Sequence, residues 1–153
     1  MLVYPGGDRE ACRPFAQRNR VDLAGRTGFI RLAMEERVPI IPVICAGAHE
    51  QLIVLSRGAR LAELLGTRRW LRTESLPWMF ALPWGLTSAY LPYRPLPSQI
   101  SIEFGAPFAI PPDADPRDEQ ALSELNARFC DRMQLMLNAL TLGRVPIVGR
   151  RGG

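Results

Sequence analysis

Residues 40–46 form an uninterrupted apolar run, from Ile40 to Ala46, and this run constrains the fold more than any other segment. Its length is typical of a β-strand, because strands of about four to eight residues are common whereas helices usually need ten or more. Every residue in it is apolar, rather than every second one, which predicts a strand buried on both faces of its sheet. Such strands are typical of parallel sheets flanked by helices.

Helical and extended patterns alternate on either side of this run. Residues 28–37 carry apolar side chains four positions apart and predict a helix, and residues 49–66 predict a second helix, broken near Gly58. Residues 99–104 alternate between polar and apolar side chains and predict a second strand. This alternation predicts an α/β fold with a mostly parallel sheet flanked by helices.

A long helix is expected near the C-terminus. Asp115 can cap its start with Pro116 at the first helical position, and Gly143 can end it. Between them, apolar residues recur at steps of three and four positions: Leu122, Leu125, Phe129, Met133, Met136 and Leu140. The 153-residue chain is therefore interpreted as one domain over residues 1–143, followed by a flexible tail over residues 144–153.

Composition narrows the possible functions only slightly. Hydrophobic residues make up 47% of the chain and charged residues 22%, which is typical of a globular protein. The net charge of +4 suits anionic lipid, a phosphorylated substrate or nucleic acid, and does not distinguish among them. Cys12, Cys45 and Cys130 lack the spacing of a disulfide framework or a zinc site, so reduced thiols and no metal are expected. No signal peptide is recognisable at the N-terminus.

The N-terminal segment carries the densest set of candidate binding residues. Residues 2–3 are apolar and predict the end of a strand, so the Gly-Gly turn that follows is expected at a strand's C-terminal edge, where α/β sheets bind ligands. Two glycines allow a ligand to approach the backbone closely, and an arginine and a glutamate place opposite charges beside it. The candidate binding residues of this segment are Pro5, Gly6, Gly7, Arg9 and Glu10.

Residues 75–93 carry no charge and are rich in aromatic side chains and proline, within a Pro- and aromatic-rich insert over residues 75–97. The segment is long enough to span a bilayer, but its prolines oppose a membrane-spanning helix. The basic and aromatic cluster just before it is typical of a membrane surface. We therefore predict an element that contacts lipid or lines an acyl-chain groove; the alternative is a Pro-rich loop packed as ordinary core. The candidate membrane-interface residues are Arg68, Arg69, Trp70, Arg72, Trp78, Phe80 and Trp84.

The order of these blocks resembles the glycerolipid and lysophospholipid acyltransferase family, especially its diacylglycerol-acyltransferase-like branch with a Pro-Gly-Gly-x-x-Glu block. The resemblance extends to about residue 108. The matching blocks are residues 5–10, 26–29, 38–43, 47–50, 82–87 and 91–93. It implies a partial acyltransferase-like α/β fold. It also implies transfer of an acyl group from acyl-CoA or acyl carrier protein to a glycerolipid or other lipid hydroxyl, with no further cofactor.

In that family a histidine of a His-x-x-x-x-Asp block acts as general base on the acceptor hydroxyl. His49 is the only histidine of this chain, and Val54 stands where the aspartate would be, so His49 is interpreted as a structural residue. The resemblance implies that the chain supplies acceptor-binding residues, with Arg26 as a further phosphate candidate, and no catalytic residue. Gly6 stands where the phosphate-using branch has a glutamate, whereas Glu10 fits the neutral-lipid branch.

The family's catalytic block would lie upstream of the first residue of this chain. We therefore interpret the chain as the C-terminal part of an acyltransferase with an unpaired sheet edge. It is expected at the cytoplasmic side of a membrane as a peripheral protein, and inactive alone. Two alternatives remain. One is a non-catalytic membrane or lipid-binding remnant; the other, a nucleic-acid-binding module, is disfavoured because the arginines are dispersed.

Overall fold

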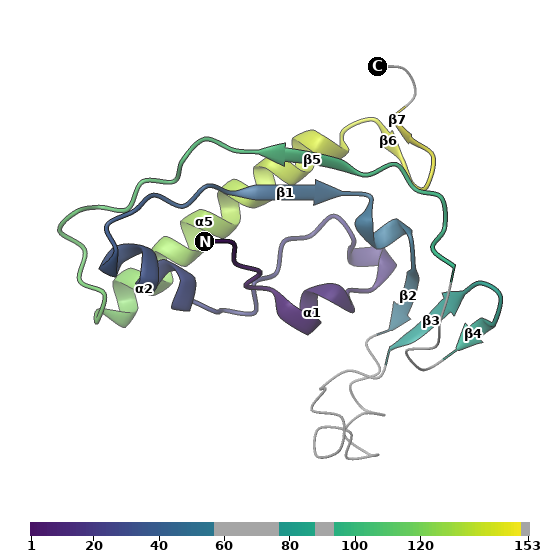
Figure 1. Ribbon diagram of the computed structural model, residues 1–153, viewed down its shortest axis with the longest axis horizontal. Helices are drawn as coiled ribbons and strands as arrows, with labels where there is room; N and C mark the ends of the chain where they lie inside the picture. The colour runs from purple at the N-terminus through teal and green to yellow at the C-terminus, as the bar shows by residue number, and fades with distance from the viewer. Residues whose placement is uncertain (57–76, 88–93, 151–153) are drawn as a thin grey trace, which may run out of the picture. The chain divides into compact units, whose positions relative to one another are not determined.

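A computed structural model describes residues 1–56, 77–87 and 94–150 of the chain (Figure 1). The chain forms two compact units and passes from one to the other several times. The first unit comprises residues 1–7, 19–46 and 101–142, and the second is drawn from residues 8–18, 47–100 and 143–153.

Each unit contains short strands, and the two longer helices among the described residues lie in the first. The elements of the first unit are α2 (Gly28–Glu35), β1 (Val43–Ala46), β5 (Ser101–Phe104) and α5 (Glu119–Thr141). The described elements of the second are the 3₁₀ turns η1 (Phe15–Gln17) and η2 (Ala48–Glu50), with β2 (Ile53–Ser56), β3 (Trp78–Ala81), β4 (Gly85–Thr87), β6 (Arg144–Val145) and β7 (Gly149–Arg150). A short helix, α1 (Gly7–Ala11), begins with the last residue of the first unit's N-terminal segment and continues in the second unit.

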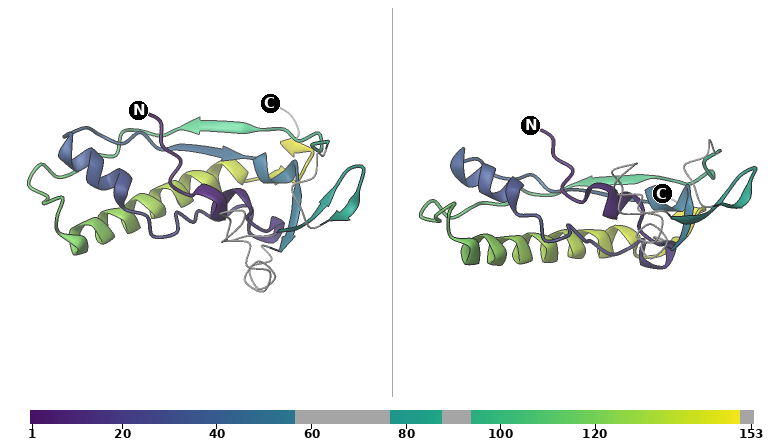
Figure 2. Two further views of the ribbon diagram at one scale, coloured as in Figure 1. Left: turned by 60° about the horizontal axis from the view of Figure 1, so that its bottom comes forward. Right: turned by 90° about the horizontal axis from the view of Figure 1, so that it is seen from below.

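In the first unit, β1 and β5 pair as an antiparallel ribbon, with Val43 opposite Phe104 and Ala46 opposite Ser101. The helix α5 runs along one side of these strands, as Figure 2 shows. Ile44 and Ala46 of β1 pack against Leu137 of α5 on that side. The predicted mixture of helices and strands, with a long C-terminal helix, is therefore confirmed.

The prediction of a mostly parallel sheet is not met by the described strands, which all pair antiparallel: β1 with β5, β2 with β3, β3 with β4, and β6 with β7. The reason lies in the path of the chain. It leaves the first unit after Ala46 and re-enters it at Ser101, directly opposite, so β5 must run back along β1. A parallel pair would need a crossover to the far end of β1.

The strand predicted over residues 40–46 is shorter than expected and alternates in burial. It covers Val43–Ala46, and only every second side chain is buried. Pro42 lacks the N–H that a ladder requires, while Ile40 forms an isolated bridge with Phe108. No strand forms at residues 2–3 in the described structure.

The core of the first unit is built around Phe129 of α5. Its ring lies 5.3 Å from that of Phe29 and 5.3 Å from that of Phe108, the latter nearly edge-on. Leu122 and Leu125 lie on the same stripe of α5 and are buried with it. The periodicity of the predicted final helix is thus confirmed by the side of α5 that it buries.

The start of α5 lies one turn later than predicted. Asp118, not Asp115, is the N-cap, and its carboxylate accepts from the backbone N–H groups of Gln120 at 2.9 Å and Ala121 at 3.2 Å. Asp115 instead accepts from the N–H of Arg117 at 2.9 Å in the turn before the helix. Two aspartates three residues apart can both cap, and local sequence does not choose between them. Gly143, with φ of +70°, follows the helix end as predicted.

Of the two other predicted helices, the one in the first unit is confirmed and the one in the second is not. The helix predicted over residues 28–37 is confirmed as α2, Gly28–Glu35. The helix predicted over residues 49–66 is wrong for its described part, because residues 53–56 form β2. Val54 of β2 pairs opposite Met79 of β3, and both side chains are buried, so cross-strand packing determines the structure of this segment. Residues 57–66 lie outside the described residues.

Residues 144–150 were expected to be part of a flexible tail. In the structure, Arg144–Val145 and Gly149–Arg150 pair as the antiparallel ribbon β6–β7. The ribbon is fixed to the second unit through Arg144, whose side chain is 4% exposed. Residues 144–150 therefore pair and pack within the second unit, residues 151–153 lie outside the described residues, and the mobility of the tail stays a prediction.

Candidate functional site

In the first unit, Arg26 folds back onto the Pro5-Gly6-Gly7 turn. Its Nη1 donates a hydrogen bond of 2.8 Å to the carbonyl oxygen of Pro5. Gly7 adopts a φ of +56°, in the left-handed region, and a Cβ at this position would collide with the Arg26 guanidinium. The left-handed backbone favours glycine here, and any side chain at this position would have to displace the Arg26 guanidinium from the turn.

A tight turn positions Arg26. Leu23 is buried in the core of the first unit, and its carbonyl oxygen accepts from the N–H of Arg26 at 3.1 Å. Between them, Ala24 and Gly25 both have positive φ, and Asp22 accepts from the N–H of Ala24 at 2.9 Å. The apolar anchor and the turn together direct the arginine toward the N-terminal segment.

The resulting arrangement places a cation beside exposed glycine backbone. A guanidinium carries five N–H donors in a planar fork, which matches carboxylate, phosphate and carbonyl oxygens. Gly6 is buried and Gly7 is exposed, so the turn presents main chain rather than side chain at its surface. Among the predicted binding residues, the structure brings together Pro5, Gly6, Gly7 and Arg26.

Arg9 and Glu10 belong to α1 and to the second unit. The side chain of Arg9 lies outside the described part of the structure. The carboxylate of Glu10 lies 3.4 Å from Nη2 of Arg13, one helical turn later. Arg13 was not among the predicted site residues, although its i, i+3 spacing from Glu10 is a signal for such a pair.

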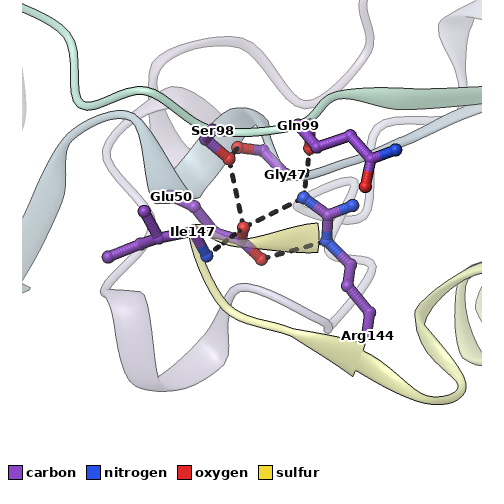
Figure 3. A network of polar contacts seen from close by, with 6 residues as sticks. All are labelled: Gly47, Glu50, Ser98, Gln99, Arg144 and Ile147. Atoms are coloured by element: carbon purple, nitrogen blue, oxygen red, sulfur yellow. Dashed lines mark hydrogen bonds and ion pairs between the residues drawn. The ribbon is translucent and has the colours of Figure 1, made fainter. Parts of the chain in front are cut away.

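In the second unit, Glu50 is the centre of a buried polar network, which Figure 3 shows. Its Oε2 accepts from Nη2 of Arg144 at 3.0 Å and from the N–H of Ile147 at 2.8 Å, and Oε1 lies 3.3 Å from Nε of Arg144. The hydroxyl of Ser98 lies 3.1 Å from both Oε2 and the Gly47 carbonyl, and its single proton can reach one of them at a time. Arg144 also donates to the carbonyl of Gln99.

These contacts keep Glu50 ionised. Burial raises the pKa of its carboxyl, but the hydrogen bonds from Arg144 and Ile147 and the charge of Arg144 hold it below its ordinary value. A carboxylate with a lowered pKa, filled by donors, is a poor proton acceptor at neutral pH. Glu50 therefore links η2 to the β6–β7 segment through Arg144 and Ile147. No local pattern in the sequence indicates this pair, because Arg144 stands 94 positions from Glu50.

His49, beside Glu50 in η2, is half-buried. Burial, and then the positive charge of Arg13, lower the pKa of its imidazole, so it is neutral at pH 7. Among residues 1–56, 77–87 and 94–150, no three His, Cys, Asp or Glu side chains gather as a metal ion would require.

The ribbon β3–β4 has an exposed apolar face. Trp78 and Phe80 alternate with the buried Met79 and Ala81, and Leu86 of β4 lies directly opposite Phe80. Two further exposed side chains, Leu82 and Trp84, lie in the connection between the strands. Of the predicted membrane-interface residues, Trp78, Phe80 and Trp84 thus lie on or beside one ribbon.

The other four predicted membrane-interface residues, Arg68, Arg69, Trp70 and Arg72, lie outside the described residues. Within the described part of the chain, no helix combines the length and the apolar character needed to cross a bilayer.

The sequence pattern of the diacylglycerol acyltransferase family matches residues 1–140, which include the Pro5–Gly7 turn, Arg26 and almost all of α5. The chain belongs to this family. The resemblance stated from the sequence blocks is therefore confirmed at the level of the family, and it extends beyond residue 108.

Curated relatives of this chain come from mycobacteria. Uncharacterized proteins of Mycobacterium bovis and Mycobacterium tuberculosis are each 31% identical to it over 144 residues, which cover 93% of this chain and 38% of theirs. An uncharacterized protein of Mycobacterium leprae is also 31% identical over 144 residues, which are 37% of its length. No solved structure matches the chain. This diacylglycerol acyltransferase family member thus spans less than two fifths of the relatives it matches.

Proposed function

We propose that this chain supplies the acceptor-binding part of an acyltransferase that moves an acyl group from acyl-CoA or acyl carrier protein to the hydroxyl of a glycerolipid or another lipid. Family membership supports the reaction class. In such a reaction a base removes the hydroxyl proton, the alkoxide oxygen bonds to the thioester carbonyl carbon, and the thiolate leaves. His49 does not fit the role of base, because Val54 stands where the family's aspartate would be.

The observation that carries the proposal is the contact of Arg26 with the Pro5-Gly6-Gly7 turn. The Arg26 guanidinium is fixed by the Pro5 carbonyl at 2.8 Å, beside glycine backbone that a polar lipid headgroup can approach closely. A cation held in place before binding loses less conformational entropy when it engages an ester, phosphate or hydroxyl oxygen of the acceptor. In this role Arg26 binds and orients the acceptor.

Replacing Arg26 with glutamine should weaken acceptor binding by about tenfold or more, because a hydrogen bond from a charged donor contributes about 1.5–3 kcal/mol. The measurement is equilibrium binding of the purified chain to a short-chain diacylglycerol and to the matching lysophosphatidate, each in neutral detergent micelles. Arg31→Gln is the matched control, since Arg31 pairs with Glu119 at the surface of the same unit. Equal affinities of the chain and of Arg26→Gln for both lipids would contradict the proposal.

The exposed face of the β3–β4 ribbon favours a second role, contact with a membrane surface. Trp78 and Phe80 present large amphipathic or apolar side chains on a ribbon whose opposite side is buried, and Trp84 lies close in sequence. Tryptophan is favoured where lipid meets water, and a net charge of +4 adds attraction to anionic lipid. We propose that the protein lies on the cytoplasmic face of a membrane and touches it through this ribbon. A chain that binds vesicles but no acceptor would be a lipid-binding remnant of the family.

The double substitution Trp78→Ala with Phe80→Ala should lower the partition of the chain onto vesicles by about tenfold or more. Each side chain loses a large part of the roughly 1.5–3 kcal/mol that full burial of such a group contributes. The measurement is sedimentation with vesicles of phosphatidylcholine containing phosphatidylserine. Leu135→Ala, which changes an exposed leucine on α5, should leave the partition unchanged. If both variants sediment as the parent chain does, the ribbon is not the membrane contact.

A further inference from the structure

In the ribbon β1–β5 of the first unit, strand β1 has one covered face and one exposed face, while Glu103 of β5, opposite Ile44, is exposed. On the covered face, Ile44 and Ala46 pack against α5. The side chains that alternate with them point the other way and are exposed. We name this exposed side the outer face, formed by Val43, Cys45, Ile102 and Phe104.

The outer face is a continuous apolar surface. Val43 lies directly opposite Phe104 across the ribbon, and Cys45 lies directly opposite Ile102, so the four side chains form two adjacent cross-strand pairs. Ile102 is 60% exposed and Phe104 is 74% exposed. Contiguous exposed apolar side chains are more typical of an interaction surface than of the rest of a protein's surface.

The sequence of β1 is suited to burial on both faces, whereas α5 covers one. Polar residues would be expected at positions 43 and 45 if their face stood in water, yet valine and cysteine occupy them. Among the described helices none packs on the outer face, and helices normally cover the faces of sheets in α/β proteins, so a cover for it would have the chemistry of an apolar helix face.

The relatives indicate where that helix comes from. In the Mycobacterium tuberculosis relative, the segment that matches this chain is only 38% of the polypeptide. The remainder is tethered to the matched segment and therefore present at high effective concentration. We propose that the outer face of β1–β5 is the docking surface for an amphipathic helix of the acyltransferase polypeptide beyond the matched segment.

Two other occupants fit the outer face less well. A membrane surface would favour tryptophan or tyrosine with flanking arginine, and the outer face has isoleucine, valine, cysteine and phenylalanine instead. A second copy of this chain lacks the covalent tether that holds the remainder of the relatives' polypeptide close to the matched segment. The inference rests on family membership and does not depend on acyl transfer.

The exposed thiol of Cys45 provides a direct test. The chain is inserted into the Mycobacterium tuberculosis relative in place of the matched segment, and the rate of maleimide labelling of Cys45 is followed by peptide mass spectrometry. Labelling should be at least tenfold slower in this chimera than in the chain alone. Ser123→Cys, at an exposed polar position of α5, is the matched control and should label equally fast in both. Equal labelling of Cys45 in both proteins would overturn the proposal.

A charge on the outer face gives a second, independent measurement. Ile102→Glu should shift the melting temperature of the chain alone by less than about 2 °C, and that of the chimera by more than about 5 °C. Ser123→Glu should have little effect in either protein.

Light scattering of the chain alone needs no chimera. A dimer that Ile102→Glu dissociates would assign the outer face to a second copy of the chain and overturn the proposal. Protection of Cys45 by vesicles alone would likewise assign it to membrane.

Discussion

Replacing Arg144 with alanine should lower the free energy of unfolding of the second unit by about 3–5 kcal/mol, because it leaves the Glu50 carboxylate buried without its cation. Both side chains of the pair are 4% exposed, so water cannot substitute for the lost guanidinium. The loss should appear in chemical denaturation and as faster hydrogen exchange in η2 and β6. The second unit, rather than the first, should carry the effect, since every contact of Figure 3 lies within it.

An exposed ion pair of the first unit provides the matched control. Arg31 and Glu119 also form a salt bridge, but their side chains are 41% and 76% exposed. Arg31→Ala should therefore change the free energy of unfolding by less than about 1 kcal/mol. If the two arginine variants lose stability equally, burial of the Glu50–Arg144 pair is not what stabilises the second unit.

The same pair sets an acid dependence. Because the folded protein holds the pKa of Glu50 below its ordinary value of 4.5, the carboxylate contributes stability that is fully present above that value. This contribution is lost as the pH falls through the folded-state pKa. Glu50→Gln should remove this part of the acid dependence below about pH 4.5, measured as denaturation midpoints from pH 7 to pH 3. An unchanged acid profile in Glu50→Gln would mean that other carboxyls determine it.

Replacing Phe129 with alanine should lower the free energy of unfolding of the first unit by about 3–5 kcal/mol, as expected for a large side chain removed from a packed core. Phe129 is 3% exposed, and its ring contacts those of Phe29 and Phe108, so the cavity would open where α5 meets the rest of the core. Urea denaturation, monitored by circular dichroism of the helical signal, measures the loss.

Phe104→Ala is the matched control for this substitution. Phe104 is in the same unit but is 74% exposed, so its removal should change the stability of the isolated chain by less than about 0.5 kcal/mol. A loss of stability from Phe104→Ala as large as that from Phe129→Ala would show that the outer face is already covered in the isolated chain.

The C-terminal helix α5 shows which features a local sequence pattern can predict. The stripe of Leu122, Leu125 and Phe129 predicted both α5 and the side it buries, because helical periodicity depends on residues three and four positions apart. Its start was predicted one turn early, since Asp115 and Asp118 offer equivalent caps. Which one begins the helix depends on how the preceding turn packs.

The strands show where local patterns fail. The alternation of residues 99–104 predicted β5, but neither its direction nor its exposed side. The segment after Glu50 has a helical pattern and forms β2, because Val54 is buried through its pairing with β3. Strand pairing depends on partners that are distant in sequence, and the same segment can satisfy either pattern until those partners are known.

The candidate site likewise has features that local sequence predicts and features that depend on tertiary contacts. The family blocks, the glycines of the Pro5–Gly7 turn, the stripe of α5 and the aromatic character of the β3–β4 ribbon could all be read from the sequence, because each is a property of neighbouring residues. Only the tertiary structure brought Arg26 onto Gly7, paired Glu50 with Arg144 and left the outer face of β1–β5 exposed. The Arg26–Gly7 and Glu50–Arg144 contacts each close a long loop, and the exposure of the outer face depends on which elements pack nearby. These features depend on residues far apart in the sequence, which no local pattern contains.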